Sequence, residues 1–179
     1  MSQNQHQTAP IGSKTLVLVG LMGAGKSSVG RRLADRLNMP FIDSDDAIEA
    51  AADLTIPEIF EKFGEQYFRE GEERVIERLL NDPPCILATG GGAYLSEKTR
   101  QNISKTAVSV WLKADLETLW QRVSGKPGRP LLQAENPKMV LKNLIDTRYP
   151  IYDLADVIVV SYLDNPHEIV VDDILEALK

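Results

Sequence analysis

The chain has 179 residues and a formal net charge of -6 at pH 7, with 43% hydrophobic and 26% charged residues. This composition is typical of one globular domain with its own core, and it excludes disordered, collagen-like and coiled-coil proteins. The acidic balance argues against nucleic acid or an anionic membrane as the main partner.

The first 14 residues are rich in Gln, Asn, Ser and Thr and lack a basic segment followed by an apolar stretch. We therefore predict a disordered leader over residues 1–14 and a single domain over residues 15–179. No apolar run approaches the length of a membrane span, so the sequence predicts a cytoplasmic protein with no membrane partner. The single cysteine, Cys85, reads as the buried start of a strand, and with the two histidines it cannot form a zinc site.

Short β-branched runs alternate with amphipathic helical patterns along the rest of the chain. The predicted strands are 15–20, 40–43, 85–88, 107–112 and 157–160. The predicted helices are 27–37, 45–51, 56–80 with a break at Gly64, 96–102, 115–123, 137–149 and 166–178. Pro150 is expected to end the helix before it. This alternation predicts an α/β fold, with a five-stranded parallel sheet flanked by helices.

One interior stretch, 124–136, breaks the alternation. It contains two glycines and two prolines among polar residues, together with Lys126 and Arg129. Such a composition predicts a mobile loop, which we interpret as a lid over a ligand.

The segment Gly20 to Ser27, with the sequence GLMGAGKS, matches the phosphate-binding pattern GxxxxGK[ST] between a predicted strand and a predicted helix. Its glycines let backbone N–H groups converge on phosphate oxygens, while Lys26 can reach the β and γ phosphates and Ser27 can bind Mg²⁺. The alternative is a tight glycine turn with an exposed lysine, which the strand and helix on either side disfavour. The segment predicts ATP and Mg²⁺ as ligands. The residues predicted to bind the nucleotide here are Gly23, Ala24, Gly25, Lys26, Ser27 and Ser28.

The rest of the sequence favours a small-molecule kinase. The GTPase patterns DxxG and NKxD do not occur. The strand 85–88 runs into Gly90, Gly91 and Gly92 rather than into the acidic residue of a mechanical ATPase. These glycines expose backbone amides at the carboxyl end of a strand, where open α/β sheets bind ligands.

Two aspartates, Asp43 and Asp45, follow the second predicted strand. One carboxylate can hold Mg²⁺ through water while the other accepts or orients the proton of an attacking hydroxyl, as phosphoryl transfer requires. The alternative is that both simply cap the following helix.

Six segments in this order resemble the shikimate kinase family. They are GLMGAGKS at 20–27, DSD at 43–45, GEQYFR at 64–69, GGG at 90–92, RPLL at 129–132 and RYPIY at 148–152. The resemblance extends from about residue 15 to 178. It implies a P-loop kinase of the nucleoside-monophosphate-kinase type with strand order 2-3-1-4-5. It also implies transfer of the γ-phosphate of ATP to the 3-hydroxyl of shikimate, on the route to chorismate and the aromatic amino acids.

The same resemblance assigns roles to individual residues. Asp45 would hold the shikimate hydroxyls and act on the attacking one, and Asp43 would lie in the Mg²⁺ shell. The residues implied to bind the rest of shikimate are Arg69 and Arg148 at its carboxylate and Gly90, Gly91 and Gly92 at a ring hydroxyl. Arg129 would close over the phosphates, while Arg122 and the loop near Pro166 would bracket the adenine.

The arginines also have structural interpretations. Arg69 can pair with Glu72 and Glu73 on its own helix, and Arg148 suits the dipole at a helix C-terminus. Gly71 departs from the family, which often has another basic residue shortly after the arginine at position 69.

Two rival functions remain open. One is a related kinase for gluconate or a nucleotide, although two arginines and a glycine triplet favour a small anionic polyol. The other is a non-catalytic ATP-binding regulator, although Lys26 and Asp45 are both present. We expect a monomer.

Overall fold

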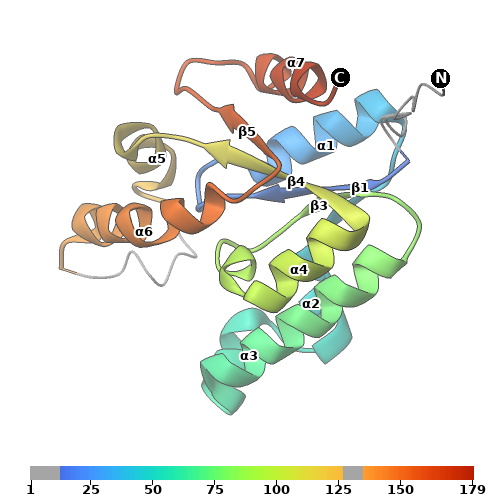
Figure 1. Ribbon diagram of the computed structural model, residues 1–179. Coiled ribbons are helices and arrows are strands. Elements are labelled where there is room, and N and C mark those ends of the chain that lie inside the picture. The colour runs from blue at the N-terminus through green and yellow to red at the C-terminus, as the bar shows by residue number, and fades with distance from the viewer. Residues whose placement is uncertain (1–12, 127–134) are drawn as a thin grey trace.

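The computed structural model describes residues 13–126 and 135–179, and in these ranges the strands form one parallel sheet (Figure 1). The strands are β1 (Thr15–Val19), β2 (Phe41–Asp43), β3 (Ile86–Ala88), β4 (Ala107–Lys113) and β5 (Val157–Val160). Their order is β2-β3-β1-β4-β5, and all four neighbouring pairs are parallel. The predicted fold class and strand order are therefore confirmed.

The helices lie on both faces of the sheet. They are α1 (Lys26–Leu37), α2 (Ser44–Ala52), α3 (Ile56–Asn81), α4 (Glu97–Thr106), α5 (Leu116–Val123), α6 (Pro137–Tyr152) and α7 (His167–Ala177), with a 3₁₀ turn η1 (Ala93–Leu95). Helices α1 and α7 pack together on one face, and α3 packs against α4 on the other (Figure 1). None of the helices in the described ranges is both long and apolar enough to cross a membrane.

Local sequence determines where several helices begin. Thr55 and Glu58 form a reciprocal capping box at the start of α3, and the side chain of Asp115 accepts a hydrogen bond from the Thr118 N–H at the start of α5. Such caps satisfy N–H groups that have no partner within the helix. Gly64 has φ of 82° and interrupts α3, as predicted, because this left-handed conformation suits glycine.

Two apolar clusters hold the chain together. The main one surrounds β1, all five residues of which are buried, as expected for a central strand covered on both faces. The smaller one consists of Ile48, Ile59 and Phe68, which pack α2 against α3. This second cluster fixes the helix that carries Arg69.

Three details of the prediction were wrong or missing. Helix α6 continues through Pro150 to Tyr152, because a proline near a helix end removes only one backbone donor and Tyr152 is anchored by its own side chain, as described below. Helix α4 continues to Thr106, and η1 was not predicted.

Candidate active site

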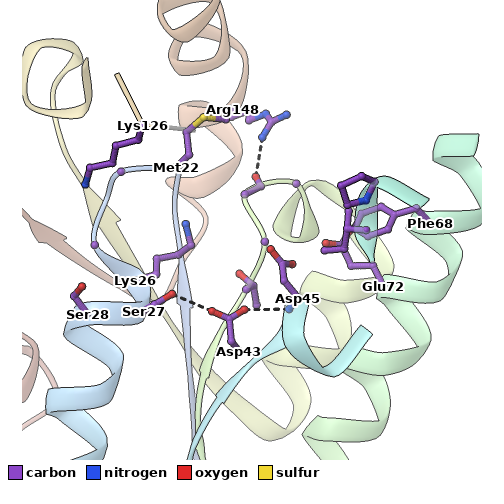
Figure 2. Close-up of a pocket in the computed structure, with 18 of the residues that line it drawn as sticks. Met22, Lys26, Ser27, Ser28, Asp43, Asp45, Phe68, Glu72, Lys126 and Arg148 are labelled. Atoms are coloured by element: carbon purple, nitrogen blue, oxygen red, sulfur yellow. Dashed lines mark hydrogen bonds between the residues drawn. The ribbon is translucent and has the colours of Figure 1, made fainter. Parts of the chain in front are cut away.

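A cavity of about 1040 Å³ opens at the carboxyl ends of β1, β2 and β3 (Figure 2). It is lined by most of the predicted site residues: Gly23, Gly25, Lys26, Ser27, Ser28, Asp43, Asp45, Arg69, Gly90, Gly91, Gly92, Arg122 and Arg148. Ala24 lies buried within the phosphate-binding loop rather than on the cavity wall. Arg129 and most of the predicted lid lie outside the described residues.

The phosphate-binding loop connects β1 to α1. Gly25 caps the N-terminus of α1 in a left-handed conformation with φ of 97°, which an L side chain rarely adopts. The first turn of α1 contains no acidic residue, so its N–H groups and the helix dipole favour an anion. The Nζ of Lys26 donates hydrogen bonds to the carbonyls of Gly20 at 2.7 Å and Leu21 at 3.0 Å.

The last residue of β2 and the first two of α2 point to three different parts of the site. Asp43 accepts a hydrogen bond from the Ser27 hydroxyl at 2.9 Å. Ser44 is fully buried, and its hydroxyl accepts a hydrogen bond from the Gly90 N–H at 3.2 Å. Asp45 reaches toward the glycine triplet (Figure 2). Asp43 also caps α2 by accepting from the Asp45 N–H, so the capping interpretation holds for Asp43 alone.

The glycine triplet lies against the side chains predicted to bind the substrate. A Cβ atom added to Gly90 would be 2.9 Å from Asp45 Oδ1. On Gly91 it would be 3.5 Å from Arg148 Nη1, and on Gly92 only 2.5 Å from Arg69 Nη1. The three glycines therefore leave room for side chains from α2, α3 and α6 to meet at one loop.

Arg69 forms an ion pair with Glu72, as the alternative interpretation of the sequence proposed. Its Nη1 lies 2.8 Å from Glu72 Oε2, and its Nη2 lies 3.4 Å from the exposed Glu65. The Arg69 side chain is 36% exposed, whereas that of Glu72 is only 3% exposed. The Arg69 side chain therefore remains partly accessible at the cavity, while its ion-pair partner Glu72 is buried.

Two carboxyl groups beside the glycine triplet have altered pKa values. Burial raises the pKa of Asp45, and the neighbouring Asp43 adds to this effect. Burial also raises the pKa of Glu72, although Arg69 partly offsets it. The Oε1 atom of Glu72 is buried without a hydrogen-bond partner among the described residues. A buried carboxylate oxygen without a donor has lost its hydration, which is consistent with the raised pKa of Glu72.

Helix α6 supplies Arg148 and a residue that the sequence analysis did not single out. The Nη1 of Arg148 donates to the Gly91 carbonyl at 3.0 Å (Figure 2), and the hydroxyl of Tyr152 donates to the same carbonyl. Glu72, Ser44 and Tyr152 were all missed as site residues. Ser44 and Tyr152 lie within the segments DSD and RYPIY that carry the family resemblance, and Glu72 was named only as a possible partner of Arg69.

Arg122 spans the gap between the phosphate-binding loop and the segment after β5. Its guanidinium donates to the Gly23 carbonyl at 3.3 Å, the Ser161 hydroxyl at 3.1 Å and the Tyr162 carbonyl at 2.7 Å. Pro166 does not line the cavity, but the next residue, His167, does. Lys126 also lines it and reaches toward the loop from above (Figure 2).

The oxygens of Ser27 and Asp43 suit a magnesium ion, which binds through one or two protein oxygens and keeps water and phosphate for the rest. No group of three or more His, Cys, Asp or Glu side chains within residues 13–126 and 135–179 is arranged to hold a metal by itself.

The chain is similar to known proteins over nearly its whole length. The family model for shikimate kinase matches residues 22–179. Shikimate kinases from Rhizobium leguminosarum bv. trifolii and Caulobacter vibrioides are 54% and 56% identical to it, over 95% and 96% of this chain and 86% and 85% of the relatives. The structure of shikimate kinase from Acinetobacter baumannii in complex with shikimate has a TM-score of 0.86 at 38% identity, covering 91% of both chains.

Proposed function

The chain belongs to the shikimate kinase family, and from this premise we propose that its cavity holds ATP beside shikimate and directs the γ-phosphate to the 3-hydroxyl. The enzyme is an ATP-dependent shikimate kinase.

The phosphate-binding loop is proposed to bind ATP, the phosphate donor. The N–H groups of the loop and the N-terminus of α1 bind the phosphates. Lys26 exchanges its two carbonyl partners for phosphate oxygens, and its positive charge offsets the negative charge on those oxygens during transfer. Ser27 and Asp43 would hold Mg²⁺, directly or through water. A metal bound there would supply positive charge that offsets the charge of the phosphates. Arg122 and His167 lie beside the loop, where the adenine would extend, and Arg129 is proposed to close over the phosphates.

Asp45 is the residue proposed to act on the acceptor. It lies at the glycine triplet, close enough to Gly90 to share a substrate hydroxyl with that loop. Its raised pKa makes it a better proton acceptor than an exposed aspartate, which suits removal of the proton from the attacking hydroxyl.

Arg69 and Arg148 are proposed to bind the carboxylate of shikimate. A planar guanidinium matches a planar carboxylate with two parallel hydrogen bonds, so arginine suits this task better than lysine. The observation that carries the proposal is that Asp45, Arg148 and Arg69 approach three consecutive glycines from three helices. One small acid with ring hydroxyls can contact all of them at once.

We further propose that the protein functions as a single domain and a monomer in the cytoplasm, where ATP is available. One chain provides both the donor and the acceptor side of the cavity, and light scattering during gel filtration tests the monomer.

An ADP-release assay with shikimate, gluconate and nucleoside monophosphates as acceptors tests the function. We expect turnover with shikimate only. A variant with Lys26→Met is the control, because it should fold but not transfer phosphate. Equal turnover with gluconate or a nucleotide would favour the related kinases, and no turnover with any acceptor would favour an ATP-binding regulator.

A further inference from the structure

Tyr152 is a buried tyrosine in the last turn of α6 to which the proposed reaction assigns no role. It has 0% exposure, and its hydroxyl donates to the Gly91 carbonyl. The same carbonyl accepts from Arg148, one turn earlier in the helix. Two donors from α6 therefore hold one carbonyl of the glycine triplet.

Aromatic neighbours fix the ring of Tyr152. The centroid of Trp111 in β4 lies 5.9 Å away, and that of Tyr94 in η1 lies 6.5 Å away. Tyr94 lies in the 3₁₀ turn that follows the glycine triplet, with Ala93 between it and Gly92. Tyr152 thus contacts this segment twice, through its hydroxyl at Gly91 and through its ring at Tyr94.

The Gly91 carbonyl also determines the direction of a neighbouring donor. The carbonyl of Gly91 and the N–H of Gly92 belong to one planar trans peptide and point in opposite directions. Holding the carbonyl toward α6 therefore turns the Gly92 N–H away from α6. Among the described residues, no protein group accepts a hydrogen bond from the Gly91 or Gly92 N–H. Both glycines line the cavity, where a substrate would bind.

We propose that Tyr152 is a positioning residue for shikimate, which fixes the Gly91–Gly92 peptide and the guanidinium of Arg148 that binds the same carbonyl. This inference rests on the proposed roles of Arg148 and the glycine triplet. Without the tyrosine hydroxyl, the Gly91 carbonyl loses one of its two hydrogen-bond donors. The Gly91–Gly92 peptide, and Arg148 bound to it, are then held less firmly.

Tyr149 provides a matched control. It lies on the same helix, and its hydroxyl donates to the carbonyl of Ala114 rather than to the glycine triplet. Tyr152→Phe and Tyr149→Phe therefore remove the same atom and one hydrogen bond to a carbonyl each. We expect both variants to lose similar thermal stability.

Steady-state kinetics distinguish the two variants. Tyr152→Phe should raise the KM for shikimate about tenfold, in line with loss of one buried hydrogen bond, while kcat and the KM for ATP stay near their normal values. Tyr149→Phe should leave the KM for shikimate unchanged. An unchanged KM in Tyr152→Phe, or an equal rise in both variants, would overturn the inference.

A second readout does not depend on how much of the variant is folded. It is the ratio of kcat/KM for shikimate to that for its methyl ester, which should fall in Tyr152→Phe and stay normal in Tyr149→Phe. Arg148→Ala separates this inference from the proposed function. If Arg148→Ala leaves the ratio unchanged, the proposed role of Arg148 fails. If Arg148→Ala lowers the ratio and Tyr152→Phe does not, only the role of Tyr152 fails.

Discussion

The hydroxyl of Ser27, in the phosphate-binding loop, donates a 2.9 Å hydrogen bond to the carboxylate of Asp43 at the end of β2. Ser27 lies in the first turn of α1, which follows β1, and Asp43 ends β2. In the sheet, β1 and β2 are separated only by β3. The contact brings together the hydroxyl and carboxylate oxygens that magnesium prefers.

Removal of the Ser27 hydroxyl should increase the magnesium requirement. Ser27→Ala leaves Asp43 free to cap α2, so the fold should be unchanged. We expect the Mg²⁺ concentration needed for half-maximal rate to rise by roughly 10-fold or more at saturating ATP, a loss comparable to that of an outer-shell partner at other metal sites. A magnesium titration at constant ATP measures it. An unchanged titration curve would exclude Ser27 from the metal site.

Replacing Asp45 by asparagine should stabilise the protein while it inactivates the enzyme. We expect kcat to fall roughly 10²-fold or more, because the amide cannot accept the proton. Burial raises the pKa of Asp45 in the folded state, so the folded protein binds this proton more tightly than the unfolded chain. Ionisation of Asp45 therefore lowers stability as the pH rises through the range between the ordinary and the raised pKa.

Thermal unfolding across a pH series checks this effect. Asp45→Asn should have the higher melting temperature at neutral pH, and the difference should shrink as the pH is lowered. If the variant is less stable at neutral pH, burial does not dominate the environment of Asp45. If only the KM for shikimate rises, Asp45 binds the substrate without accepting its proton.

Alanine at Gly92 should impair shikimate binding, whereas alanine at Gly71 should leave it unchanged. Gly92 has helical φ and ψ of -98° and -15°, so alanine fits its backbone, but the new methyl group would displace the guanidinium of Arg69. Gly92→Ala should raise the KM for shikimate about tenfold or more, since small displacements of binding groups are costly.

Gly71→Ala is the matched control on α3. The nearest atom to its new methyl group is the end of the Arg74 side chain at 3.9 Å, so there is space for it. We expect normal kinetics and an increase of about 0.5–1 kcal/mol in the free energy of unfolding, because glycine is a poor helix former. Denaturant titrations and kinetics on both variants test the pair, and a normal KM in Gly92→Ala would contradict the position of Arg69.

The sequence predicted the sheet well because the strands and loops carry strong local signals. The apolar run of β1, the glycine loop and the cap at Asp115 each depend on neighbouring residues. The path of α6 past Pro150 could not be predicted in the same way, because the contact between Tyr152 and Gly91 joins residues far apart in the chain.

The burial of Glu72 was not predictable for the same reason. From the sequence, Arg69 and Glu72 resemble an ordinary surface pair on a helix. In the fold, Glu72 is buried beside Gly90 while Arg69 remains partly exposed. Arg69 can therefore pair with Glu72 and still bind a substrate carboxylate. The sequence pattern alone did not show that these two roles are compatible.

The relative kcat/KM of the unmutated enzyme for shikimate and for its methyl ester tests most directly whether Arg69 and Arg148 bind the carboxylate. The ester keeps the ring hydroxyls but removes the charge that two guanidinium groups are proposed to bind. We expect kcat/KM for the ester to be roughly 10²-fold lower or more, with an unchanged KM for ATP, because a site built for a polar group penalises an analogue that lacks it. In Arg69→Ala and Arg148→Ala the difference should shrink. Equal kcat/KM for acid and ester in the unmutated enzyme would show that the two arginines do not bind a carboxylate.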